Sequence, residues 1–126
     1  MATGLHDGVC VQDFGISGKT EADGLAVGRP SAFVGRVVSS LVSGIATIQD
    51  ATLYDLMRGL LRTEDTFIEP SSCAAFAALL QPSVMAQYLK SNGLEDKASS
   101  ITHTAWATGG RMVPAATRDA YLKMGL

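Results

Sequence analysis

Charged residues are scarce in this sequence of 126 residues, because Asp, Glu, Lys and Arg make up only 17% of it, against about one quarter of an ordinary globular domain. The 10 basic residues are outnumbered by 12 acidic ones, which gives a net charge of -2. A chain without an excess of positive charge has little electrostatic attraction for nucleic acid or for an anionic membrane. We therefore expect neither nucleic acid nor a membrane as a partner.

Cysteine is also rare, with Cys10 and Cys73 as its two occurrences. A disulfide scaffold needs more cysteines in a shorter chain, so we expect two free or buried thiols. Combined with His6 and His103, these cysteines form no spacing typical of metal ligands. The sequence therefore predicts no metal site.

Long apolar runs are missing as well. No stretch reaches the length of about 20 residues that a membrane-spanning helix needs, and residues 1–8 carry no apolar run of the kind found in signal peptides. The expected location is cytoplasmic. Yet 47% of the residues are hydrophobic, which indicates either a tightly packed small domain or an apolar surface that covers another part or self-associates.

The chain divides by pattern into a loop-rich segment, 1–29, and a part with regular periodicity, 30–126, which we interpret together as a single partial domain. Helical spacing of apolar residues and short apolar runs alternate along the second part. The first expected helix begins after Ser31 and ends at Gly44, and the second begins after Asp50. Three more helices are expected at 73–80, 84–90 and 114–124, and strands are expected at 45–48, 66–68 and 101–107. Strand and helix thus alternate three times, which predicts the α/β class with a small, mostly parallel sheet.

Several side chains have expected roles in these elements. The second helix should bury Leu53 and Met57, together with Leu60 and Leu61. Ser71 and Ser72 are placed to cap the third helix, and Trp106 is expected in the core of the third strand.

Two turns at predicted strand ends are candidate ligand sites, because ligands of open parallel sheets bind beyond the carboxyl ends of the strands. One is Glu69-Pro70-Ser71-Ser72, and the other is Thr108-Gly109-Gly110. Glycines allow the backbone to approach a ligand closely, and Thr108 offers a hydroxyl. The alternative, which the pattern leaves open, is a solvated strand end and an ordinary tight turn.

Several longer segments are too particular to be generic turns or helices. The most specific strings are ADGLAVGRPS at 22–31 and WATGG at 106–110. The others are HDG at 6–8, VQDFG at 11–15, TLYD at 52–55, EPS at 69–71 and MVP at 112–114. In this order, and over nearly the whole chain from His6 onward, the segments resemble bacterial D-serine dehydratase. An EPS turn alone is shared by many related pyridoxal-phosphate enzymes.

The resemblance implies a fold type II pyridoxal-phosphate enzyme that eliminates ammonia from D-serine to give pyruvate. The chain would be the C-terminal part of its large cofactor-binding domain, a partial three-layer sandwich. In the family, the threonine of the ATGG turn faces the pyridine nitrogen of the cofactor, and here this is Thr108, followed by Gly109. Gly24 of the ADG segment and Glu69 of the EP turn are expected against the cofactor pocket.

The chain departs from the family in what it does not contain. None of Lys19, Lys90, Lys97 and Lys123 stands in the Ser-x-Lys setting of the Schiff-base lysine, and the glycine run that binds the cofactor phosphate is missing. We therefore predict no catalytic residue in this chain, which is well under half of a family member, and expect it to be inactive alone. Its expected partners are the remaining N-terminal part of the enzyme and D-serine.

Two alternatives remain from the sequence. One is a non-catalytic domain that binds a small ligand or a protein partner. The other is a fragment of an L-serine or L-threonine dehydratase, which the EPS turn does not exclude.

Overall fold

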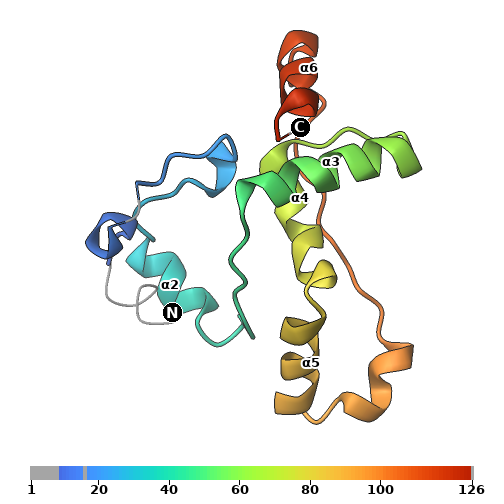
Figure 1. The fold of residues 1–126 in the computed structure, drawn as a ribbon. Coiled ribbons are helices and arrows are strands. Elements are labelled where there is room, and N and C mark those ends of the chain that lie inside the picture. The colour runs from blue at the N-terminus through green and yellow to red at the C-terminus, as the bar shows by residue number, and fades with distance from the viewer. Residues whose placement is uncertain (1–8, 16, 126) are drawn as a thin grey trace. The chain divides into compact units, whose positions relative to one another are not determined.

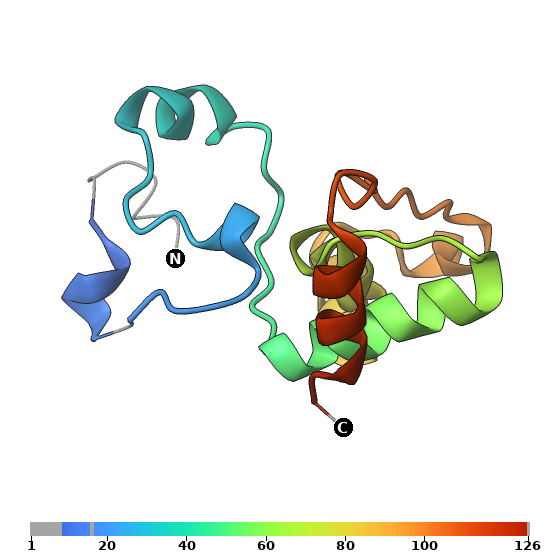
Figure 2. The same cartoon turned by 90° about the horizontal axis from the view of Figure 1, so that it is seen from above.

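The computed structural model describes residues 9–15 and 17–125, so the matched segment with His6 lies outside the described residues. The chain falls into two compact units, Met1–Ile45 and Ala46–Leu126, and each unit is considered by itself (Figure 1, Figure 2). It stays a prediction that residues 1–126 form a single partial domain, with a loop-rich segment at 1–29.

In its described residues, 9–15 and 17–45, the first unit consists of loops with three short helical elements. These are the 3₁₀ helices η1 (Val11–Phe14) and η2 (Asp23–Leu25) and the helix α2 (Ala32–Val38). The amide of Val11 donates a hydrogen bond of 2.8 Å to the carbonyl of Gly28, which joins η1 to the segment before α2. Ala22 is buried, whereas the side chains around it are mostly exposed.

Helix α2 begins where the sequence predicted it. The hydroxyl of Ser31 accepts a hydrogen bond of 3.4 Å from the amide of Val34, as a capping serine does. The helix ends at Val38, before the expected stop at Gly44. Phe33, in its first turn, is 68% exposed.

The second unit contains the longer helices. In chain order they are α3 (Asp50–Glu64), α4 (Pro70–Ala77), η3 (Ala78–Leu80), α5 (Pro82–Ser91), η4 (Glu95–Ser100) and α6 (Ala115–Lys123). Proline at the first position of α4 and of α5 suits a helix start, because that amide has no partner within the helix. After η4 the chain runs through residues 101–109 without regular structure before it reaches α6.

The core of this unit lies between α3 and α4, which pack against each other. Leu53 and Met57 are one turn apart on α3 and are 1% and 0% exposed, and Cys73 of α4 is 0% exposed. The predicted apolar face of this helix is therefore confirmed, with Leu60 and Leu61 half-buried at its far end. Full burial of such side chains stabilises the fold by roughly 1.5–3 kcal/mol each.

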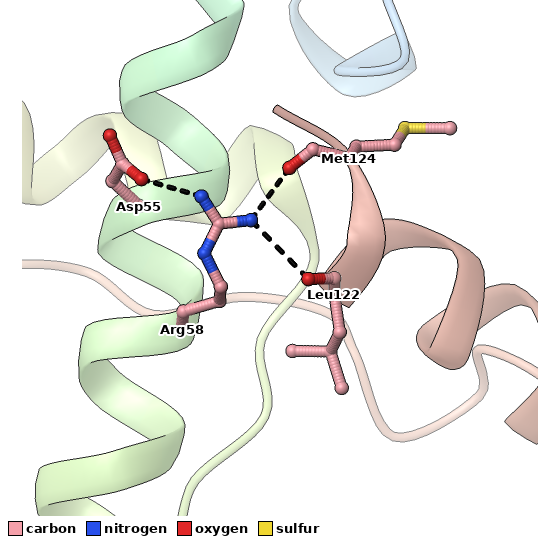
Figure 3. Close-up of polar contacts among 4 residues, drawn as sticks. All are labelled: Asp55, Arg58, Leu122 and Met124. Atoms are coloured by element: carbon pink, nitrogen blue, oxygen red, sulfur yellow. Dashed lines mark hydrogen bonds and ion pairs between the residues drawn. The ribbon is translucent and has the colours of Figure 1, made fainter. Parts of the chain in front are cut away.

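Arg58 joins α3 to the end of α6 (Figure 3). Its Nη1 donates hydrogen bonds of 3.3 Å and 2.6 Å to the carbonyl oxygens of Leu122 and Met124. Its Nη2 forms an ion pair with Asp55, one turn earlier on α3. The last carbonyls of α6 have no amide partner within the helix, so a guanidinium is well suited to bind them.

The predicted α/β class is wrong, because residues 9–15 and 17–125 form helices and no strand or sheet. The segments 45–48, 66–68 and 101–107 were expected to be strands, and Ile101 does have extended dihedral angles (φ -75°, ψ 131°). A strand, however, requires a ladder of hydrogen bonds to a neighbouring extended segment. None of the three segments has such a neighbour in the described part of the chain, so each remains an unpaired connection.

Trp106 differs from its prediction for the same reason. It was expected in a strand core, but its side chain is 79% exposed. Without a sheet on either side, the segment 101–107 has little to pack against.

No helix of the described part combines the length and apolar character that crossing a bilayer requires.

Candidate functional site

Ser72 and Thr108, which are 36 residues apart, form a hydrogen-bonded pair. Their hydroxyl oxygens lie 2.9 Å apart, and the amide of Thr108 donates a second hydrogen bond of 3.2 Å to Oγ of Ser72. Ser72 is 5% exposed and lies in the first turn of α4. The predicted site residue Thr108 is therefore held on both its backbone and its side chain by a buried partner.

The glycines after Thr108 pack directly on the segment that precedes α4. Gly109 and Gly110 both have positive φ angles, 68° and 112°. Residues with a Cβ atom seldom adopt this backbone conformation. A methyl group on Gly110 would lie 2.8 Å from the Cα of Ile68 and 2.8 Å from the carbonyl oxygen of Phe67. This turn needs glycine both for its dihedral angles and for its close contact with backbone.

Glu69, another of the predicted site residues, lies beside this turn. A methyl group on Gly109 would overlap the Glu69 carboxylate, so the carboxylate fills the space left by the missing side chain. Both residues line an open groove of about 460 Å³, with Arg111 and Tyr121 among its other walls. No lysine lines this groove in the described part of the chain.

Arg118 of α6 holds the other side of the glycine turn. Its Nη2 donates hydrogen bonds of 3.0 Å and 2.8 Å to the carbonyls of Gly110 and Arg111, and its Nε donates one of 2.9 Å to that of Val113. The guanidinium also lies 4.9 Å from the ring centroid of Phe67, within the range of a cation–π contact. Arg118 thus fixes the loop that follows the predicted site residues.

Cys73, next to Ser72, also lies near the start of α4. Burial raises the pKa of its thiol to about 11, and the negative charge of Glu69 acts in the same direction. A thiol with this pKa is protonated at neutral pH and is a poor nucleophile. Both Cys73 and the half-buried Cys10 are free thiols.

Gly24, the fourth predicted site residue, belongs to the first unit, in η2. It is exposed, and its amide donates a hydrogen bond of 2.7 Å to Oδ1 of Asp23. The second unit thus brings together Glu69, Thr108 and Gly109, and the position of Gly24 relative to them stays a prediction. The described residues contain no group of three or more His, Cys, Asp or Glu side chains able to hold a metal ion.

Sequence reasoning missed two residues of this site. Ser72 was expected to cap α4, but its hydroxyl binds Thr108 instead. Arg118 was not considered, because its partners are backbone carbonyls five to eight residues earlier, which no pattern of side chains reveals. Chemically, the cluster presents a neutral hydroxyl, a carboxylate and a glycine turn, groups that recognise a small polar ligand.

Comparison with known proteins gives a consistent result over the whole chain. The chain is 46% identical over 129 residues to a probable D-serine dehydratase of Geobacillus stearothermophilus. The match covers 100% of this chain and 28% of that protein. Proteins described in the same words from Desulfitobacterium hafniense and Fusobacterium nucleatum are each 46% identical, over 99% and 97% of this chain and 29% and 28% of their own lengths. No protein-family model matches. The chain is thus homologous to probable D-serine dehydratases and spans little more than a quarter of their length.

Proposed function

We propose that this chain is the C-terminal part of a D-serine ammonia-lyase, an enzyme that converts D-serine to pyruvate and ammonia with pyridoxal phosphate as cofactor. The proposal is supported by the homology along the whole chain. The observation that carries it is the Thr108 hydroxyl, which Ser72 holds at the edge of a glycine turn.

The residues around Thr108 fit such a cofactor. A hydroxyl beside a pyridine nitrogen can donate or accept a hydrogen bond, but it carries no charge to keep that nitrogen protonated. The bound cofactor would supply an electron sink, and one that is weaker beside a hydroxyl than beside a carboxylate. This suits elimination, in which the β-hydroxyl departs and no long-lived carbanion is needed. Gly109, with no side chain, leaves the backbone open to close approach by a ring.

The residues of this chain would bind and orient rather than move the α-proton. No lysine lines the groove at Glu69 and Gly109 in the described part, and an imine-forming lysine is what the reaction requires. We infer that this lysine and the phosphate-binding glycines belong to the remaining N-terminal part of the enzyme. The isolated chain should therefore produce no pyruvate.

An exchange protein tests the proposal. The 129 residues matched in the Geobacillus stearothermophilus relative are replaced by this 126-residue chain, and pyruvate release is measured with D-serine, L-serine and L-threonine. The expected result is turnover of D-serine by the exchange protein and by the unaltered relative, and none by the chain alone. A well-folded exchange protein that binds no pyridoxal phosphate, or that prefers an L-amino acid, would contradict the proposal.

Thr108→Val in the exchange protein locates the effect. This variant keeps the shape of the side chain and removes the hydroxyl, so the affinity for pyridoxal phosphate and the turnover of D-serine should both fall. Thr104→Val, at an exposed position of the same segment, is the matched control and should behave like the unsubstituted protein.

A non-catalytic domain that binds a protein partner is the alternative, and exposed apolar side chains favour it. Leu41, Trp106 and Met112 are 73%, 79% and 92% exposed, and such residues often mark contact surfaces. Light scattering distinguishes the two functions. A stable self-associated form of the chain, combined with an inactive exchange protein, would favour the partner-binding domain.

A further inference from the structure

We propose that Ser72 is the residue that positions Thr108, and that it does so by directing the hydroxyl proton of Thr108 toward the ligand. This role rests on the proposed function, since it describes how Thr108 would meet the pyridine nitrogen of the cofactor. The resemblance that predicted Thr108 as a site residue gives no role to Ser72.

The contacts of Ser72 restrict Thr108 in two ways. The amide of Thr108 donates to Oγ of Ser72 at 3.2 Å, which fixes the backbone at the start of the glycine turn. The two hydroxyls lie 2.9 Å apart, which fixes the rotamer of the threonine. Without Ser72, the exposed hydroxyl of Thr108 would be free to rotate, because the described hydrogen bonds of this side chain involve no other residue.

Ser72 is itself held rigidly. It is 5% exposed and precedes Cys73, which is 0% exposed in the core between α3 and α4. Its amide donates a hydrogen bond of 3.0 Å to the carbonyl of Glu69 at the beginning of α4. A side chain on a packed helix keeps a ligand-binding group in place better than a loop residue does.

The protons of the pair decide what Thr108 offers to a ligand. A hydroxyl has one proton to donate and two lone pairs. Oγ of Ser72 already accepts the amide proton of Thr108. When Ser72 donates its own proton to Oγ1 of Thr108, the threonine keeps its proton for an acceptor outside the pair. An unprotonated pyridine nitrogen is such an acceptor, and Ser72 and Thr108 carry no charge that would protonate it.

The first test needs no cofactor. In the 126-residue chain, hydrogen exchange of the Thr108 amide is compared between the unsubstituted protein, Ser72→Ala and Ser83→Ala. Ser83 is an exposed serine near the start of α5 and serves as the matched control. Ser72→Ala should speed the exchange of the Thr108 amide by about tenfold, and Ser83→Ala should leave it unchanged. Equal exchange in all three proteins would overturn the proposal.

The second test uses the exchange protein and the affinity for pyridoxal phosphate, measured by the absorbance of the bound cofactor. Ser72→Ala should weaken binding about five- to tenfold on its own and have no further effect when Thr108→Val is already present, because it acts through Thr108. Equal losses in both backgrounds would overturn the positioning role. Ser72→Thr retains the hydroxyl and should restore binding, and thermal unfolding of each variant excludes a general loss of structure.

The two proposals fail in different ways. An unsubstituted exchange protein that folds but binds no pyridoxal phosphate overturns the proposed function, and the role of Ser72 with it. An exchange protein that turns over D-serine while Ser72→Ala behaves like Ser83→Ala overturns the role of Ser72 alone.

Discussion

Gly110→Ala should be among the most damaging single substitutions in this chain. The backbone of Gly110 has a φ angle of 112°, a region that costs other residues about 1–3 kcal/mol. The added methyl group would also lie 2.8 Å from the Cα of Ile68 and 2.8 Å from the carbonyl oxygen of Phe67. Both neighbours are backbone atoms that cannot rotate away, and forcing such an overlap costs about 1–3 kcal/mol more. The expected loss of unfolding free energy is therefore about 2–6 kcal/mol.

Urea-induced unfolding of the 126-residue chain, followed by far-ultraviolet circular dichroism, measures this loss. Gly59→Ala is the matched control, because Gly59 lies inside α3 and an added methyl group there meets no atom within 4 Å. Alanine in a helix interior should raise the unfolding free energy by about 0.5–1 kcal/mol. Refutation would be a Gly110→Ala chain with the same urea midpoint and slope as the unsubstituted one, which would mean that the glycine turn does not pack as described.

Three further outcomes are expected. Arg58→Ala should lower the unfolding free energy by about 2 kcal/mol, because two charge-assisted hydrogen bonds to the end of α6 are lost. Urea unfolding measures this loss. Arg62→Ala, at an exposed position of α3, is the control and should change the unfolding free energy by less than about 0.5 kcal/mol. Arg118→Lys keeps the charge but replaces the planar guanidinium, whose Nε and Nη2 bind three carbonyls, by a single ammonium nitrogen. It should cost about 1–2 kcal/mol in the same assay. The pKa of the Cys73 thiol is raised from 9.0 to about 11, so a thiol reagent at pH 8 should modify Cys10 first and Cys73 only on unfolding. Because the pKa of Cys73 is higher in the folded chain than in the unfolded one, the stability linked to this thiol is complete below pH 9.0. It falls as the pH rises toward about 11.

Helices were predictable here because their signals are local. The spacing of Leu53 and Met57 predicts the buried face of α3, and Ser31 and Pro82 mark helix starts within one or two residues of where they lie. These interactions join residues that are at most four positions apart. The sequence pattern alone was sufficient to recognise them.

Strands were not predictable for the opposite reason. The apolar segment 45–48 has the composition of a buried strand, but composition does not tell whether another extended segment will lie beside it. In the described part none does. The prediction therefore treated an apolar segment as if its partner were already present.

The site lies between these two cases. Motif resemblance selected Glu69, Thr108 and Gly109, which the structure brings together. The pairing of Ser72 with Thr108 crosses 36 residues, and a serine near a helix start is more simply interpreted as a cap. Only the packing of the glycine turn on residues 67–69 makes that pairing evident.

Trp106, the one tryptophan of the chain, lies two residues before Thr108 and is 79% exposed. Its indole should emit at the long wavelengths typical of a water-exposed ring. Any molecule that covers the segment 101–109, whether the rest of an enzyme or a second copy of the chain, would shift this emission to shorter wavelengths. The chain thus carries its own fluorescent reporter beside the predicted site, with no second tryptophan to obscure the signal.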